Sequence, residues 1–243
     1  VTEFTFQLAR VGTVLGGALV LPATRETVRG YLDYSIAAPD ELTTIANVMH
    51  LPPAPFVPDD RVGEVALVIL AVWDGDIEAG REALAPLRTL AEPLADTIQP
   101  MPYAGMYHYT AAQEMPHADA TRAMFANELS DRMIDETLAA VAASPGPMSL
   151  VQFRGMGGAV ARVGSNATAF AHRQQPWFVA ILGLWTDAEG AILKGLGLRH
   201  VPAADLARDS QPILDWIETE GITHLAVHFD LDVLDPAHFS PLL

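Results

Sequence analysis

Residues 1–187 predict an α+β fold in which an antiparallel sheet carries its helices on one face, followed by a partial α/β unit. Before residue 187, expected strands and helices follow one another in the order β-α-β, β-α, α-β-β, with hairpin-like steps between neighbouring units. From about Ala191 the order becomes β-α-β, which implies a parallel pair with a right-handed crossover. This change of pattern predicts a domain boundary near Asp187–Lys194.

The first expected elements form the beginning of the sheet. Val1–Leu8 alternates apolar and polar residues, which predicts a strand with one buried face. Gly12–Leu21 is an apolar second strand. A helix follows, capped by Thr24 and ending near Ala37, because a threonine side chain can accept hydrogen bonds from the first free backbone N–H groups. Leu42–Met49 is the next strand.

The middle of the chain predicts a loop, a strand and a helix. Leu51–Asp60 contains four prolines and must be a loop. Val65–Trp73 is the most hydrophobic strand. Asp76 caps a helix that continues to about Leu90 and is expected to bend at Pro86.

One long helix is expected over Ala118–Ala143, followed by two strands, Met148–Arg154 and Trp177–Trp185. The glycine-rich turn Gly155–Gly158 follows the first of these strands and is expected to open no helix, which argues against phosphate binding. In the last part, a helix over Ser210–Glu220 lies between two further expected strands.

Composition limits the classes of partner. The chain has 14 basic and 30 acidic residues, a formal charge of -16 and 50% hydrophobic residues, and its mean hydropathy is +0.22. Nucleic acid and anionic membranes attract clustered Lys and Arg, so neither is an expected partner. A small-molecule substrate is expected instead, and a homo-oligomer is compatible with the sequence.

The sequence also gives expectations about the cellular location of the protein and about the length of the natural chain. The longest apolar run, Val65–Trp73, is too short to span a bilayer, and no basic-then-apolar leader opens the chain. The chain has no cysteine, which excludes disulfides and thiolate zinc sites and is compatible with a reducing compartment, so a cytoplasmic location is expected. Because Val1 starts in mid-strand, we expect the natural N-terminus to lie upstream.

The strand expected within Gly221–Pro236 places Asp230 and Asp232 on one face at its carboxyl end. Carboxylates at such a position can hold divalent ions, whereas the simpler alternative is that they face water or cap the next helix. The string His228–Pro236 resembles the last metal motif of the arginase/agmatinase (ureohydrolase) family, and the resemblance extends back to about Ala191. It implies that Asp230 and Asp232 bind manganese. Two earlier ligand motifs of that family, Gly-Gly-Asp-His and Asp-Ala-His-x-Asp, do not occur in this chain, so the ligand set is incomplete.

The first 187 residues resemble the substrate-binding domain of FAD-linked oxidases of the berberine-bridge-enzyme type. Trp185 closes the last matching strand, and the other strings that carry the resemblance are Val1–Phe6, Ala37–Leu42, Pro100–Tyr103 and Thr168–Arg173. The resemblance implies FAD as cofactor, held mainly by a flavin-binding domain that would precede residue 1 and is absent from this sequence. It also places the family's catalytic base at Ala180, which cannot transfer a proton.

Candidate substrate-binding residues are aromatic or basic. Tyr103, with the neighbouring Tyr107, His108 and Tyr109, could line a pocket or could be ordinary half-buried loop aromatics. His172 and Arg173 could face the flavin side, or could form a strand-entry pair bonded to loop carbonyls. The acid pair Asp74 and Asp76 is better explained as a turn with a helix cap than as a metal site.

Three functions are therefore compared. The expected one is a partial FAD-dependent oxidoreductase, contributing the substrate-binding domain, joined to a partial arginase-like segment and inactive alone. The alternative is a manganese-dependent ureohydrolase acting on a guanidino substrate through Asp230 and Asp232. The third is a junction of two incomplete parts with no activity of its own.

Overall fold

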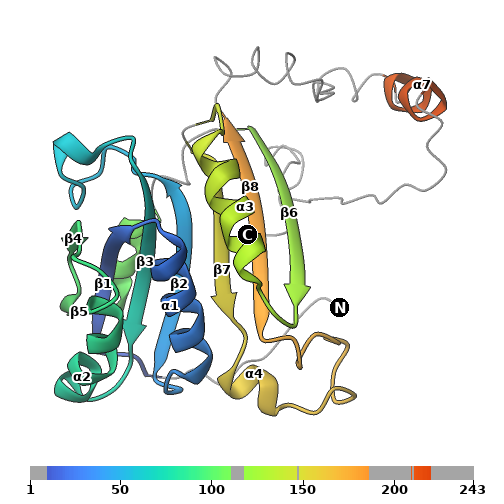
Figure 1. Cartoon of the computed structure of the whole chain (residues 1–243). Coiled ribbons are helices and arrows are strands. Elements are labelled where there is room, and N and C mark those ends of the chain that lie inside the picture. Colours follow the sequence, from blue (N-terminus) through green and yellow to red (C-terminus); the bar gives the residue numbers. More distant parts are fainter. Residues whose placement is uncertain (1–9, 111–117, 147, 186–208, 210, 220–243) are drawn as a thin grey trace. The chain divides into compact units, whose positions relative to one another are not determined.

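The computed structural model describes residues 10–110, 118–146, 148–185, 209 and 211–219 (Figure 1). The chain divides into two compact units, Val1–Ile192 and Leu193–Leu243. The first unit contains an antiparallel sheet with helices packed on one face, so the predicted α+β class is confirmed. In the second unit the structure describes helix α7 (Gln211–Thr219), which lies within the helix predicted over Ser210–Glu220.

The sheet of the first unit has eight strands in its described part. Seven follow the spatial order β4-β1-β3-β2-β7-β8-β6, and β5 pairs with β1 as well. Every pairing is antiparallel. The strands are β1 (Thr13–Pro22), β2 (Leu42–His50), β3 (Val65–Trp73), β4 (Ala95–Asp96), β5 (Gln99–Pro102), β6 (Ala118–Ala126), β7 (Leu150–Gly155) and β8 (Trp177–Trp185).

Three helices pack against this sheet: α1 (Arg25–Ala37), α2 (Ile77–Arg88) and α3 (Asp131–Ala142) (Figure 1). Each begins at a polar cap. Thr24 forms a capping box with Thr27, Asp76 accepts hydrogen bonds from two backbone N–H groups of α2, and Ser130 accepts one from Met133. The Asp76 cap confirms the structural explanation of that acid pair. Pro86 lies inside α2, two residues before its end.

The two faces of the sheet have different covers. On β3, Leu67, Ile69 and Trp73 join the core cluster that the helices complete, whereas Ala66 and Val68 belong to a second cluster on the opposite face. That second cluster is closed by the proline-rich loop after β2, which contains the 3-10 helix η1 (Asp59–Arg61). Because this loop is the cover found there, the helix-free face retains room for a cavity.

The single helix predicted over Ala118–Ala143 is wrong. Residues 118–126 form β6, which pairs with β8 along its whole length from Ala118–Trp185 to Ala126–Trp177. Only the second part of the stretch is helical, as α3. Alanine favours helices as an isolated residue, but pairing with a distant strand overrides that local preference.

Smaller differences concern short elements. The strands β4 and β5 were not predicted, and Pro100 and Pro102 are tolerated in β5 because its described pairing is with β1 alone. The prediction that the turn Gly155–Gly158 opens no helix is wrong, since the five-residue helix α4 (Gly158–Arg162) begins at its last glycine. No helix in the described ranges is long and apolar enough to cross a membrane. The strands predicted at 1–8, 196–200 and 221–236 lie outside the described residues.

Candidate substrate-binding site

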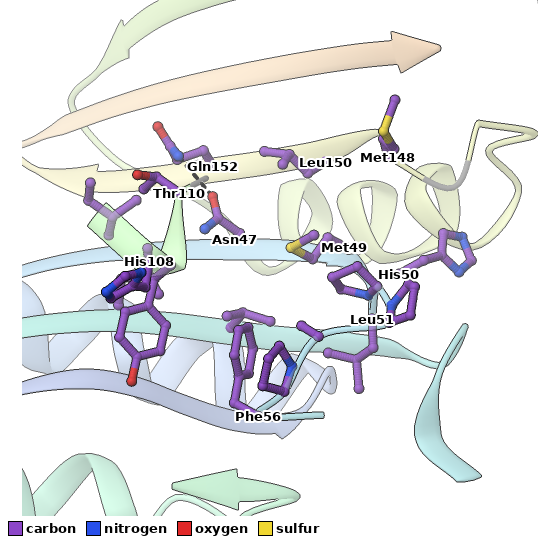
Figure 2. Close-up of a pocket in the computed structure, with 18 of the residues that line it drawn as sticks. Asn47, Met49, His50, Leu51, Phe56, His108, Thr110, Met148, Leu150 and Gln152 are labelled. Carbon is purple, nitrogen blue, oxygen red and sulfur yellow. Dashed lines mark hydrogen bonds between the residues drawn. The ribbon is translucent and has the colours of Figure 1, made fainter. Parts of the chain in front are cut away.

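A cavity of about 1160 Å³ opens on the helix-free face of the sheet (Figure 2). Its floor is made by side chains of β2, β3 and β7, and its rim by the proline-rich loop after β2 and by the 3-10 helix η2 (Tyr103–Tyr109). Residues labelled in Figure 2 that line it are Asn47, Met49, His50, Leu51, Phe56, His108, Thr110, Met148, Leu150 and Gln152. Its size is in the range of small-molecule sites.

Strand alternation explains which side chains reach the cavity. On β2, Ala46 and Val48 belong to the helix-side core, so Ile45, Asn47 and Met49 face the cavity. On β7 the same rule turns Gln152 toward the cavity. Apolar side chains therefore surround a few polar groups, which is the usual composition of a ligand pocket.

The polar centre of the floor is a buried pair of amides. Asn47 and Gln152 are cross-strand partners on β2 and β7, and each is 7% exposed. Gln152 Nε2 donates a hydrogen bond of 2.8 Å to Asn47 Oδ1 (Figure 2). Arg154 Nε donates one of 2.7 Å to Gln152 Oε1. Among the described residues the side-chain amino group of Asn47 has no partner. This group remains a donor for a ligand in the cavity.

Ala180 continues this row on the next strand. It pairs with Gln152 across β7 and β8 and is 6% exposed. Its methyl group offers no site for proton transfer.

Two histidines line the cavity, and they differ in whether their ring nitrogens have hydrogen-bond partners. Both ring nitrogens of His50 are used, since Nδ1 lies 3.0 Å from the carbonyl oxygen of Gly63 and Nε2 lies 3.0 Å from that of Val141. His108 is exposed and has no hydrogen bond or ion pair within the described ranges. The His108 ring is therefore free to contact a ligand in the cavity.

The predicted substrate-binding residues do not form one site. Tyr103 opens η2 next to β1, where its backbone N–H contacts the carbonyl of Gly12, and it is absent from the cavity lining. His172 stacks on Phe125 of β6, with ring centroids 4.2 Å apart and planes 5° apart. Strands β1 and β6 lie far apart in the order of the sheet. A role for Tyr103 and His172 in substrate binding stays a prediction.

Arg173 is fixed by its neighbours. Its Nη1 donates to the carbonyl of Val160 and its Nη2 to Thr168 Oγ1, and its guanidinium lies 5.3 Å from the Phe170 ring centroid. The acceptors are a carbonyl of helix α4 and a threonine hydroxyl, so the structural alternative of a pair bonded to loop carbonyls stays a prediction too. A substrate-binding role for Arg173 likewise stays a prediction.

The sequence reasoning missed Asn47, Gln152 and Arg154. A signal was present, because Asn47 and Gln152 are polar residues inside otherwise apolar strands. What could not be read was the register that places them opposite each other. The metal candidates Asp230 and Asp232 lie outside the described residues, and within those residues no group of three or more His, Asp or Glu side chains could hold a metal.

Comparison with solved structures reveals related folds at low sequence identity. Berberine bridge enzyme from Eschscholzia californica is 14% identical, with a TM-score of 0.59 over 91% of this chain and 44% of the enzyme. Glucooligosaccharide oxidase from Acremonium strictum is 17% identical, with a TM-score of 0.56 over 73% of this chain and 39% of the oxidase. The fold is shared with these oxidases.

A third similar structure is GilR, an oxidoreductase that catalyses the terminal step of gilvocarcin biosynthesis. It is 18% identical, with a TM-score of 0.60 over 93% of this chain and 48% of GilR. The chain therefore spans less than half the length of each of these proteins. No protein-family model and no curated protein sequence matches it.

Proposed function

We propose that residues 1–187 act as the substrate-binding domain of an FAD-dependent oxidoreductase. The observation that carries the proposal is the cavity on the helix-free face of a sheet whose fold is shared with flavin oxidases. One of these, glucooligosaccharide oxidase, carries a 6-S-cysteinyl, 8α-N1-histidyl FAD.

The lining residues fit a planar ring system and a small substrate. The unpartnered amino group of Asn47 can donate to a carbonyl at the edge of such a ring, and the surrounding apolar side chains exclude water from it. FAD, when bound, supplies the hydride acceptor. In this chain His108 is placed to accept the accompanying proton from the substrate, since Ala180 cannot.

We further propose that the diphosphate of FAD is held by protein outside the described residues. Arg154 is the one permanently charged residue among the described residues that line the cavity, and one guanidinium does not neutralise a diphosphate. The chain is then inactive until that part is supplied.

The test is a titration of the 243-residue chain with lumiflavin, the isoalloxazine ring without its diphosphate tail, followed by flavin fluorescence. We expect saturable quenching that is weakened about tenfold by Asn47→Leu, since the amino group proposed to donate to the ring carbonyl is lost. Gln174→Leu changes an exposed glutamine outside the cavity and should leave the affinity unchanged. Absence of quenching up to about 1 mM lumiflavin would contradict the proposal.

The ureohydrolase activity predicted for residues 191–243 stays a separate prediction. Its proposed ligands, Asp230 and Asp232, are outside the described residues, and no observation on the first unit favours it. Manganese-dependent release of urea that is abolished by Asp232→Asn would support it. Excess manganese that produces neither urea nor thermal stabilisation would reject it.

A further inference from the structure

The charge of the cavity differs from that of the chain. The sequence has 30 acidic residues, yet among the described residues no Asp or Glu lines the cavity. Of the described lining residues, Arg154 alone has a permanent charge. The described lining thus has one positive charge, that of the exposed Arg154, in a protein with a formal charge of -16.

Arg154 also differs from most other arginines of the described part. Seven of those arginines form an ion pair with a carboxylate: Arg25, Arg29, Arg61, Arg81, Arg88, Arg132 and Arg162. Arg154 has no carboxylate partner in the described ranges. The guanidinium of Arg154 can therefore pair with an anionic group of a ligand.

The guanidinium of Arg154 is held in place from two sides. Its Nε donates to Gln152 Oε1 at 2.7 Å, and its Cζ lies 5.7 Å from the centroid of the Phe178 ring. Gln152 is itself fixed by its hydrogen bond to Asn47. This arrangement uses the Nε–H and leaves the two Nη groups, which can bind both oxygens of a carboxylate.

We propose that the cavity selects a ligand with an apolar, planar body and an anionic group that pairs with Arg154. This inference rests on the proposed function, in which the cavity takes the substrate as well as the flavin ring. It adds the substrate class: an aromatic or alicyclic carboxylate, or a compound with an equivalent oxyanion. The apolar floor binds the body, and Arg154 determines the preference for charge.

The experiment compares two fluorescent probes of nearly equal shape, 2-naphthoate and 2-naphthamide, by titration of the full chain. We expect 2-naphthoate to bind about tenfold more tightly than 2-naphthamide at low salt, as for a charge-assisted bidentate pair. Arg154→Met should remove this preference by weakening naphthoate about tenfold while changing naphthamide by less than about twofold. Arg154→Lys should retain part of it, because the charge remains and the planar fork does not.

The control variant is Arg132→Met on the solvent side of α3, where the arginine side chain is 87% exposed and pairs with Glu136. It should leave both affinities unchanged. Equal affinity of the two probes, equal losses in Arg154→Met, no binding of either probe, or the same loss in Arg132→Met would overturn the proposal. Because this test contains no flavin, it can succeed where the lumiflavin titration fails, and the two failures are distinguishable.

Discussion

Gln152 donates a hydrogen bond to Asn47 across 105 residues of sequence, and both side chains are buried in the floor of the cavity. A buried amide without a partner is costly, so each of the two residues explains the presence of the other. The same two side chains therefore stabilise the pairing of β2 with β7 and provide the polar groups of the cavity floor.

The amide pair should show strong coupling in a double-mutant cycle. Gln152→Leu leaves Asn47 Oδ1 without its donor and should lower the free energy of unfolding by about 1–3 kcal/mol. Adding Asn47→Leu should cost much less than its single effect, because the orphaned group is removed with its partner. Urea denaturation of the four proteins measures this coupling. Strictly additive losses would show that the hydrogen bond is unimportant.

Tyr31 should make the protein sensitive to alkali. Burial raises the pKa of its hydroxyl to about 12, against an ordinary value of 10.0. The folded state therefore prefers the neutral phenol, and this contribution is complete below about pH 10 and is lost as the pH rises through 12. Two pH units correspond to about 3 kcal/mol of unfolding free energy.

The measurement is denaturant unfolding between about pH 9 and pH 12, comparing the wild type with Tyr31→Phe. The variant loses the hydrogen bond to Thr44 Oγ1 and should start less stable by about 1 kcal/mol. The free energy of unfolding of Tyr31→Phe should then decrease less with rising pH than that of the wild type. Parallel curves for the two proteins would assign the alkaline loss to other groups.

His50 should contribute to stability, whereas His108 should not. The ring of His50 connects the end of β2 to the carbonyls of Gly63 and Val141, so His50→Ala should lower the unfolding free energy by about 1–3 kcal/mol. His108→Ala removes an exposed side chain with no partner in the described part and should change stability by less than about 0.5 kcal/mol. Equal effects of the two substitutions would contradict the assigned contacts.

The sequence predicted most of the sheet because its central strands are apolar enough to be recognised locally. Val65–Trp73 and Trp177–Trp185 have the same bounds in the structure as in the prediction. Residues 118–126 failed the same reasoning because alanines carry no strong period, and only pairing with β8 makes them a strand.

The candidate site was less predictable than the fold. Its floor depends on a register that places Asn47 opposite Gln152, and no local pattern contains that register. Its rim was partly predicted, since His108 and Tyr109 of the expected aromatic cluster line the cavity while Tyr103 does not. Spacing along the chain identified polar residues but could not show which of them line the same cavity.

Gly17 should tolerate no side chain. Its φ is +150°, and a Cβ added there would lie 2.6 Å from the carbonyl oxygen of Thr97 and 2.8 Å from the Cα of Ile98. Both are backbone atoms next to β4 and β5, so the clash cannot be relieved by rotating a side chain. Gly17→Ala should therefore lower the unfolding free energy by about 2 kcal/mol or more and loosen the pairing of β4 and β5 with β1.

The matched control is Gly12→Ala, because an added Cβ at Gly12 meets nothing within 4 Å. This substitution should change stability by less than about 0.5 kcal/mol. Thermal unfolding gives the loss, and amide hydrogen exchange at residues 95–102 locates it. If Gly17→Ala were as stable as Gly12→Ala, the close approach of the Thr97 backbone to β1 would be refuted. The assignment of Thr97 and Gln99 to the cavity lining would then be wrong as well.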